Sequence, residues 1–273
     1  MFHIIVNPVA GRGHSLIRLS FLVQALEAKG MTYEVIRTAA PGDGYDKAYE
    51  ICLSGSCGII GIGGDGTVQE IVAGMADANA ESLSSAELIL TPLAILPCGS
   101  GNDFVMSLKK RENRSFFISQ QSEDRLSAKR LVEALHNRKL RNVDIIKANG
   151  MAFLNIGNIG LDARIVRGAL RHKKKFGKYA YLAAVYESIT HHENLRLIIQ
   201  ADGKTIEGEY TFVAICNGRY YGGGMPVAPD AEIDDGKITV CLVEAMSRAE
   251  AMLLFPTLLF SLHTRLKKVR YLQ

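Results

Sequence analysis

The sequence predicts an α/β fold with two domains, an N-terminal doubly wound parallel sheet and a second, mainly antiparallel β domain. Strand and helix patterns alternate over the first half of the 273-residue chain, which indicates a parallel sheet with helices on both faces. Beyond about residue 138, strand patterns follow one another with few helices between them. A hydrophobic content of 48% is enough to fill two cores. We therefore expect domains at residues 1–138 and 139–273.

The first domain repeats one unit, in which an apolar run leads into a glycine-rich loop and then a helix. The apolar run 2–6 precedes a helical pattern at 15–29, and the runs 57–60 and 93–96 lead into further helices. The three loops then lie at the carboxyl ends of parallel strands, where folds of this class bind ligands. The second half, after a helix at 125–137, contains strand patterns at 143–147, 152–156, 195–200, 210–216 and 238–243.

The loop at residues 61–67 reads Gly-Ile-Gly-Gly-Asp-Gly-Thr and ends where a helix begins. Unpaired N–H groups and the helix dipole favour phosphate oxygens there, and glycines allow close approach to the backbone. Asp65 adds a carboxylate, which repels phosphates unless a metal ion or a proton transfer intervenes. The G-x-G-x-x-G dinucleotide fingerprint also fits, but that fingerprint usually follows the first strand. The loop predicts phosphate binding with Mg²⁺ or base chemistry, and a structural tight turn is the alternative.

Two more polar, glycine-rich loops follow the first and last of these apolar runs. Residues 7–13 read Asn-Pro-Val-Ala-Gly-Arg-Gly, and residues 96–104 read Leu-Pro-Cys-Gly-Ser-Gly-Asn-Asp-Phe. Either loop alone could be an ordinary turn. Three such loops at one edge of a sheet are harder to explain as turns, so we expect one shared binding site.

The motifs N-P-x-x-G, G-G-D-G-T and L-P-x-G-[ST]-x-N-D, in this order and spacing, resemble the diacylglycerol kinase catalytic family, which includes bacterial lipid kinases and sphingosine kinases. Residues 217–237 resemble that family's second domain, so the similarity covers most of the chain. NAD kinases share G-G-D-G-T but lack the third motif. The resemblance implies transfer of the γ-phosphoryl group of ATP to the hydroxyl of a diacylglycerol-like or sphingosine-like lipid, with Mg²⁺ neutralising the charge.

The resemblance also implies roles for single residues. Asp65 would be catalytic, either by organising Mg²⁺ or by taking the substrate proton. Glu70 matches an Asn-Glu pair of the family, although Gln69 stands where the family has Asn. The residues that would contact the nucleotide are Asn7, Gly11, Thr38, Gly63, Gly64, Asp65, Gly66, Thr67, Glu70, Ser100 and Asn102.

Two expectations concern the second domain. Asp235 resembles the ligand of a structural Mg²⁺ site that backbone carbonyls near Glu232 and Ile238 complete. Kinases of the family continue to an acidic D-G-E-type motif that supplies the base, whereas the last acidic residue here is Glu250 and a strand pattern begins at Val269. We expect a truncated chain or a divergent member without that base, and a homodimer through the open sheet edge. A soluble kinase of the NAD type and a non-catalytic nucleotide- and membrane-binding protein stay open as alternatives.

Charge and composition narrow the choice of partners. The formal net charge is +4, yet residues 164–178 contribute +7 without an acidic residue, and an aromatic amphipathic pattern follows at 179–189. This combination suits the surface of an anionic membrane, and a solvated charge run beside a core helix is the alternative. No motif for nucleic acid accompanies the charge, so we expect no nucleic-acid partner.

The cysteines and the last predicted helix bear on the cellular location of the protein. The five cysteines form no CxxC pair, and the strand pattern at residues 2–6 leaves no room for a signal peptide, so we expect reduced thiols and a cytoplasmic protein at the membrane periphery. Ser247 and Glu250 form a capping box for a helix through Leu262. Its uncharged run of 12 residues contains Pro256, so it predicts a kinked core helix or an interfacial one rather than a membrane span.

Overall fold

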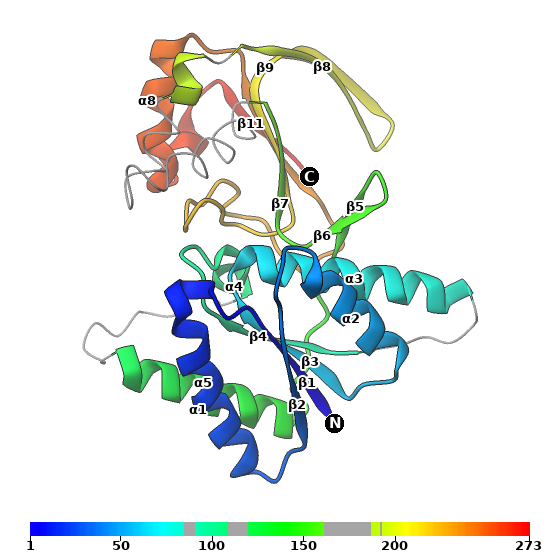
Figure 1. Cartoon of the computed structure of the whole chain (residues 1–273). Coiled ribbons are helices and arrows are strands. Elements are labelled where there is room, and N and C mark those ends of the chain that lie inside the picture. Colours follow the sequence, from blue (N-terminus) through cyan, green and yellow to red (C-terminus); the bar gives the residue numbers. More distant parts are fainter. Residues whose placement is uncertain (85–90, 109–119, 161–186, 192) are drawn as a thin grey trace. The chain divides into compact units, whose positions relative to one another are not determined.

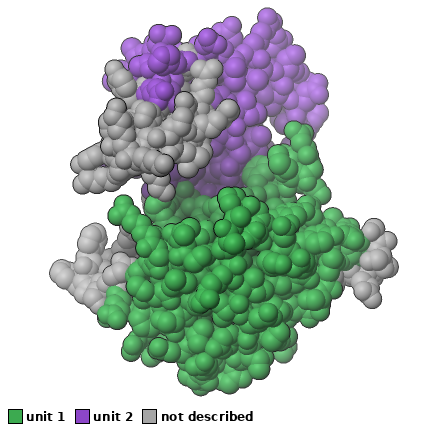
Figure 2. Space-filling view, viewed as in Figure 1, with its two compact units in different colours: residues 1–154 green, residues 155–273 purple. Residues whose placement is uncertain are grey.

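The computed structural model describes residues 1–84, 91–108, 120–160, 187–191 and 193–273 (Figure 1). The chain divides into two compact units, unit 1 at residues 1–154 and unit 2 at residues 155–273 (Figure 2). The sequence pattern places the boundary earlier, after residue 138. The basic run at 164–178 and most of the helical pattern at 179–189 lie outside the described residues.

Unit 1 contains a four-stranded parallel sheet of order β2-β1-β3-β4. Its strands are β1 (Phe2–Val6), β2 (Tyr33–Arg37), β3 (Gly58–Gly63) and β4 (Leu93–Pro97). Every residue of β3 is buried, as a central strand with helices on both faces requires. The doubly wound parallel sheet that the sequence predicts is confirmed.

The helices of unit 1 cover both faces of this sheet (Figure 1). On one face, α1 (His14–Glu27) and α5 (Gln120–His136) pack on the side chains of Ile4, Val6, Ile60 and Ile62. On the other face, α2 (Asp43–Leu53) and α3 (Asp65–Ser84) pack on Ile5 and Ile59. Adjacent strand residues thus serve opposite cores, since side chains alternate between the faces of a strand. Two short helices, η1 (Ala10–Gly13) and α4 (Asp103–Leu108), follow β1 and β4.

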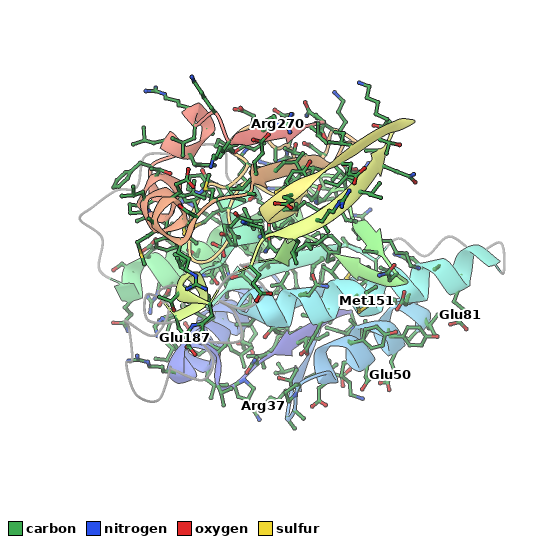
Figure 3. All side chains as sticks on the ribbon, turned by 90° about the horizontal axis from the view of Figure 1, so that it is seen from above. Arg37, Glu50, Glu81, Met151, Glu187 and Arg270 are labelled. Atoms are coloured by element: carbon green, nitrogen blue, oxygen red, sulfur yellow. The ribbon has the colours of Figure 1, made fainter. Side chains whose placement is uncertain are left out.

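A small hairpin explains why unit 1 extends to residue 154. Its strands are β5 (Ile146–Ala148) and β6 (Met151–Phe153), with Met151 labelled in Figure 3. The side chain of Gln69 on α3 donates from Nε2 to the Ala152 carbonyl at 2.6 Å and accepts from the Leu154 amide at 3.3 Å. This side chain ties the hairpin to α3, a long-range contact that strand periodicity does not reveal.

Unit 2 is an antiparallel sheet of order β11-β10-β9-β7, with β8 also paired to β9. Its strands are β7 (Ile156–Gly160), β8 (Leu195–Ala201), β9 (Lys204–Cys216), β10 (Thr239–Glu244) and β11 (Val269–Leu272). The mainly antiparallel second domain is therefore confirmed. The strand pattern that begins at Val269 is also real, because β11 pairs with β10.

The core of unit 2 lies between this sheet and α8 (Arg248–Leu259), which a 3₁₀ turn, η3 (Leu262–Arg265), follows. The predicted capping box is present, with the Ser247 hydroxyl accepting from the Glu250 amide and the Glu250 carboxylate accepting from the Ser247 amide. Leu254 and Leu258 pack toward the sheet. Across the described part of the chain, no helix has the length and apolar character that crossing a membrane requires.

Candidate functional site

Three loops of unit 1 follow neighbouring parallel strands and meet at one edge of the sheet. We call residues 7–13 the first loop, residues 63–67 the second loop and residues 98–102 the third loop; they follow β1, β3 and β4. Main-chain hydrogen bonds connect the starts of these loops. The Asn7 amide donates to the Ile62 carbonyl at 2.9 Å, and the Cys98 amide donates to the Gly63 carbonyl at 2.6 Å. The convergence expected from the sequence is therefore present.

Asn7 and Thr67 join the first loop to the second. Asn7 Nδ2 donates to Thr67 Oγ1 at 3.1 Å, while Asn7 Oδ1 accepts from the Val9 amide at 3.2 Å. Thr67 is buried at the start of α3, so its hydroxyl has a fixed position. A Cβ on Gly63 would lie 2.5 Å from Thr67 Cβ, which explains why glycine precedes this turn.

The second and third loops touch through glycine backbone atoms. A Cβ on Gly99 would lie 2.6 Å from Gly64 Cα. Gly11 of the first loop, with φ at +59°, is as crowded, because a Cβ there would lie 2.8 Å from Cys98 Sγ. Side chains at these positions would force the loops apart, so the glycines set the spacing of the whole site.

Asp65 connects the second loop to the helix that follows the third. Its carboxylate accepts from the Asn102 amide at 2.7 Å and from the Phe104 amide at 3.4 Å, at the N-terminus of α4. Helix N-termini have unpaired amides and a positive dipole end, so a carboxylate is stable there. An ionised carboxylate has about four acceptor positions, so these two bonds leave capacity for another ligand.

Asn102 shapes the third loop from within. Its φ of +56° is in the left-handed region, which Asn tolerates better than most residues. Its side chain accepts from the Gly99 amide at 2.7 Å and donates to the Gly99 carbonyl at 2.9 Å, which closes the loop. Ser100 is exposed on the same loop. The side-chain amide of Asn102 thus holds the backbone of the loop. The contact with the nucleotide that the resemblance implies for Asn102 stays a prediction.

Two of the predicted residues contact the segments around β2 and α2, Thr38 from the end of β2 and Glu70 from α3. Thr38 directly follows β2, and its amide donates to the Val6 carbonyl at 3.0 Å. Glu70 Oε2 accepts from the Gly44 amide at 3.2 Å, in the first turn of α2. A Cβ on Gly44 would lie 2.8 Å from that oxygen, so the carboxylate sits directly against the helix. Glu70 therefore anchors α2 to α3.

The second predicted metal position belongs to unit 2 and is a turn. Asp235 Oδ1 accepts from the Lys237 amide at 3.0 Å, and Gly236 between them has φ at +70°. Glu232 is exposed, with Oε1 4.0 Å from Arg219 Nη2, and Ile238 is exposed as well. The described residues contain no group of three or more His, Cys, Asp or Glu side chains placed to share a metal. A Mg²⁺ site that uses one carboxylate and backbone carbonyls is compatible with this arrangement.

A buried charge cluster behind the first loop was missed by the sequence reasoning. Asp124 on α5 is fully buried, with one oxygen 2.5 Å from His14 Nε2 and the other 2.7 Å from Arg18 Nη2. His14 and Arg18 stand one turn apart on α1, directly after the first loop. Burial also raises the pKa of the nearby Cys98 thiol. The four-residue spacing of His14 and Arg18 indicates that both side chains lie on one face of α1, so a shared acidic partner could have been expected. Nothing in the polar sequence of α5, however, marks Asp124 as buried.

The second loop has one position where glycine meets no neighbour, Gly66. A Cβ on Gly66, in the first turn of α3, would have no heavy atom within 4 Å of it beyond its chain neighbours and its own helix backbone. The other glycines of the second loop are needed for packing, whereas Gly66 is not. Its lack of a side chain therefore leaves the helix N-terminus open to a ligand.

Comparison with known families supports the reading of both units. The diacylglycerol kinase catalytic domain matches residues 1–148, and the YegS C-terminal NAD kinase beta sandwich-like domain matches residues 156–273. The catalytic-domain match covers more than half of the chain.

Similar proteins agree with these matches. A "Diacylglycerol kinase" of Bacillus subtilis (strain 168) is 27% identical over 248 residues, which are 90% of this chain and 75% of that protein. A protein of Alcanivorax borkumensis named "Probable lipid kinase YegS-like" is 28% identical over 75% of this chain, which spans 61% of that relative's length. A crystal structure of a diacylglycerol kinase from Bacillus anthracis str. Sterne superposes with a TM-score of 0.71 at 28% identity, covering 99% of this chain and 82% of the other.

The chain therefore belongs to the diacylglycerol kinase catalytic family, whose relatives are named as lipid kinases. The resemblance drawn from the three motifs is confirmed.

Proposed function

We propose that this member of the diacylglycerol kinase family is an ATP-dependent lipid kinase that transfers the γ-phosphoryl group to a lipid hydroxyl. The observation that carries the proposal is the contact of three glycine-rich loops around Asp65 at the start of α3. Phosphoryl transfer depends mainly on positioning and on stabilising negative charge, and this arrangement supplies both.

The backbone of the second loop would bind the phosphates. Gly64, Gly66 and Thr67 lie where α3 begins, so unpaired amides and the helix dipole would face the anion. Gly11 and Gly63 keep the neighbouring loops close, while Asn7 and Asn102 hold their shape. In this scheme Ser100 is the exposed side chain that would contact the nucleotide directly.

Asp65 would be the catalytic carboxylate. Two main-chain amides fix its orientation, and its remaining acceptor positions would hold Mg²⁺ or take the proton of the lipid hydroxyl. Magnesium, when bound, would neutralise the charge of the phosphates. Asp235, with the carbonyls near Glu232 and Ile238, would hold a second, structural Mg²⁺ in unit 2.

Thr38 and Glu70 would act at the border of the nucleotide site. Their contacts fix the β2–α2 corner, so we propose that Glu70 positions α2 while Thr38 faces the nucleotide. Five free cysteines agree with a cytoplasmic protein. The proposed acceptor is a diacylglycerol-like or sphingosine-like lipid at an anionic membrane, and a homodimer stays a prediction.

Asp65→Asn tests this proposal. The amide oxygen can still accept from the Asn102 amide, the shorter of the two main-chain bonds, so the fold and ATP binding should persist, while transfer falls by about 10²- to 10⁴-fold because acid–base or metal assistance is lost. The measurement is incorporation of labelled phosphate from ATP into diacylglycerol and sphingosine in mixed micelles with Mg²⁺, beside calorimetric binding of ATP.

Glu207→Gln is the matched control, because it neutralises an exposed carboxylate of unit 2 and should leave the rate unchanged. Wild-type turnover by Asp65→Asn would remove the catalytic role of Asp65. Replacing the lipid by NAD in the same assay tests the acceptor, and phosphorylation of NAD in place of lipid would contradict the proposed substrate class.

A further inference from the structure

Helix α8 of unit 2 carries a row of exposed apolar side chains. Leu253 is 74% exposed, Phe260 73%, Leu259 51% and Met252 37%, and Pro256 is also exposed. The opposite side of the helix buries Ala251, Leu254 and Leu258 against the sheet. We call the exposed set, Met252, Leu253, Pro256 and Leu259 with the C-cap residue Phe260, the outer face of α8.

The outer face is continuous along the helix. Residues 252 and 253, 256, and 259 and 260 recur at helical spacing of three and four, so they lie one above another. A surface helix normally carries polar residues there, and a helix that is apolar all round is normally buried. Leu262 in η3, 46% exposed, extends the apolar surface beyond the end of the helix. Such a surface requires an occupant.

The charges around the outer face are positive. Residues 245–273 contain five Lys or Arg and one Glu, a formal charge of +4 that equals the net charge of the whole chain. The one acid, Glu250, is paired with Lys268 at 2.7 Å, and this bond together with those from Ser247 lowers the pKa of Glu250 to about 2. Arg270, labelled in Figure 3, pairs with Glu244 at 2.7 Å.

Three exposed cations remain beside the outer face. Arg248 begins α8, Arg265 ends η3 and Lys267 follows it. Within the described residues, no salt bridge involves these three side chains. Apolar side chains between unneutralised cations are the pattern of a helix that lies in the interface of an anionic bilayer.

We propose that the outer face of α8, with η3 and its cations, docks unit 2 on an anionic lipid bilayer. The inference rests on the proposed function, because a lipid kinase has to reach an acceptor that is embedded in a membrane. A second copy of the chain fits the surface less well. Arg248 lies at one end of α8, and Arg265 and Lys267 follow its other end. An interface formed by the same patch on both copies would therefore place cations of one copy near cations of the other, and like charges at an interface disfavour association.

A single tryptophan can report insertion, because the chain contains no Trp. In Phe260→Trp, vesicles of phosphatidylcholine and phosphatidylglycerol should shift the fluorescence to shorter wavelength, and brominated lipids should quench it. Leu140→Trp, at an equally exposed position of unit 1 (73%), is the control and should keep the spectrum of Trp in water. Equal spectra with and without vesicles for Phe260→Trp would overturn the proposal.

Binding measurements test the two components separately. Leu253→Ser with Phe260→Ser should weaken cosedimentation with these vesicles at least about tenfold, since large apolar side chains lose their burial. Ile198→Ser on β8, 66% exposed, is the control and should bind like the wild type. Arg265→Gln with Lys267→Gln should weaken binding by roughly 30-fold at low salt and less at high salt, because salt screens the attraction. Wild-type binding by either pair of changes would contradict the proposal.

Two readouts separate this inference from the proposed function. Phosphorylation of a water-soluble short-chain diacylglycerol should stay at the wild-type rate in every one of these variants, because none of them changes a residue of the three loops in unit 1. If the wild type phosphorylates no lipid but the variants still lose vesicle binding, the kinase proposal fails and the docking surface stands. If sedimentation shows a dimer that Leu253→Ser with Phe260→Ser dissociates, a second copy covers the face and the docking proposal is overturned.

Discussion

In unit 1 the polar side chains around the loops bind backbone groups of the protein itself, whereas in unit 2 helix α8 exposes apolar side chains. Asp65, Glu70 and Asn102 each accept a hydrogen bond from a main-chain amide. Leu253 and Phe260, by contrast, are more than 70% exposed. The first arrangement fixes loops in one shape, which transfer of a small group between two substrates requires. Exposed apolar side chains can be buried against any apolar surface without precise shape complementarity, and this suits binding to a fluid lipid bilayer.

The comparison also concerns how each unit places charge. Unit 1 buries Asp124 completely between His14 and Arg18, while unit 2 keeps pairs such as Arg196 with Glu207 at the surface. A buried charge that loses compensation is costly, whereas an exposed pair is screened by water. The buried charge of unit 1 therefore supports the architecture of the site, whereas exposed pairs such as Arg196 with Glu207 in unit 2, or Lys47 with Glu50 in unit 1, contribute little to stability.

The largest effect on stability is expected from a mutation that disrupts the buried charge cluster of unit 1. Asp124→Ala removes the buried carboxylate from Arg18, whose side chain is only 13% exposed, and should lower the free energy of unfolding by about 3–5 kcal/mol. Urea denaturation followed by circular dichroism measures the change. The exposed control, Glu207→Gln in unit 2, should cost about 0–1 kcal/mol. Equal losses in the two variants would show that burial does not distinguish the charges of the two units.

A smaller effect on stability is expected from glycine substitutions, and it should distinguish Gly74, which packs against a neighbouring helix, from Gly66, which meets no neighbour. A Cβ on Gly74 of α3 would overlap the carbonyl oxygen of Tyr45, so Gly74→Ala should cost about 1–3 kcal/mol of stability. Gly66→Ala meets no neighbour and should be neutral or stabilising by up to about 1 kcal/mol, while it raises the KM for ATP because the methyl group blocks approach to the helix N-terminus. Thermal unfolding and steady-state kinetics measure the two effects. An unchanged KM would exclude phosphate contact at Gly66.

The smallest effect is a pH dependence in unit 2. His263 is fully buried, with Nε2 3.1 Å from the Val227 carbonyl and 2.9 Å from Tyr271 Oη, and burial lowers its pKa below the ordinary value of 6.5. Above pH 6.5 the His263 side chain is neutral in both the folded and the unfolded state, so it does not lower the free energy of unfolding. As the pH falls below 6.5, the unfolded state takes up the proton first, and stability should drop by at most about 1.4 kcal/mol per pH unit.

Urea titrations between pH 7.5 and 5 measure this decline. His263→Gln should flatten it, whereas the control His136→Gln, at an exposed position of α5, should leave it as in the wild type. A decline of the same size in His263→Gln would assign the acid sensitivity to other groups.

Local patterns predicted most of the fold and the location of the site. The expected strands at 2–6 and 93–96 agree with β1 and β4 to within one residue, and the capping box at Ser247 is present. These features depend on periodicity and on residues close in sequence, which a single chain displays directly. The three loops were found in the same way, since each lies between a strand pattern and a helix pattern.

Partners distant in sequence were not predictable in this way. Gln69 binds residues 152 and 154, and Asp65 binds the amides of residues 102 and 104. Such pairs depend on which loops and helices pack side by side, so a motif can name Asn102 or Glu70 without saying that its side chain faces the backbone of its own domain.

The sequence by itself determined the order of strands and helices, the three loops and the family, because glycines, apolar periodicity and motifs are local. The tertiary structure alone decided that Asp124 is buried, that Gly66 is open and that the outer face of α8 is exposed. Burial is a property of packed neighbours, and an apolar helix reads the same in sequence whether the protein core covers one of its faces or both.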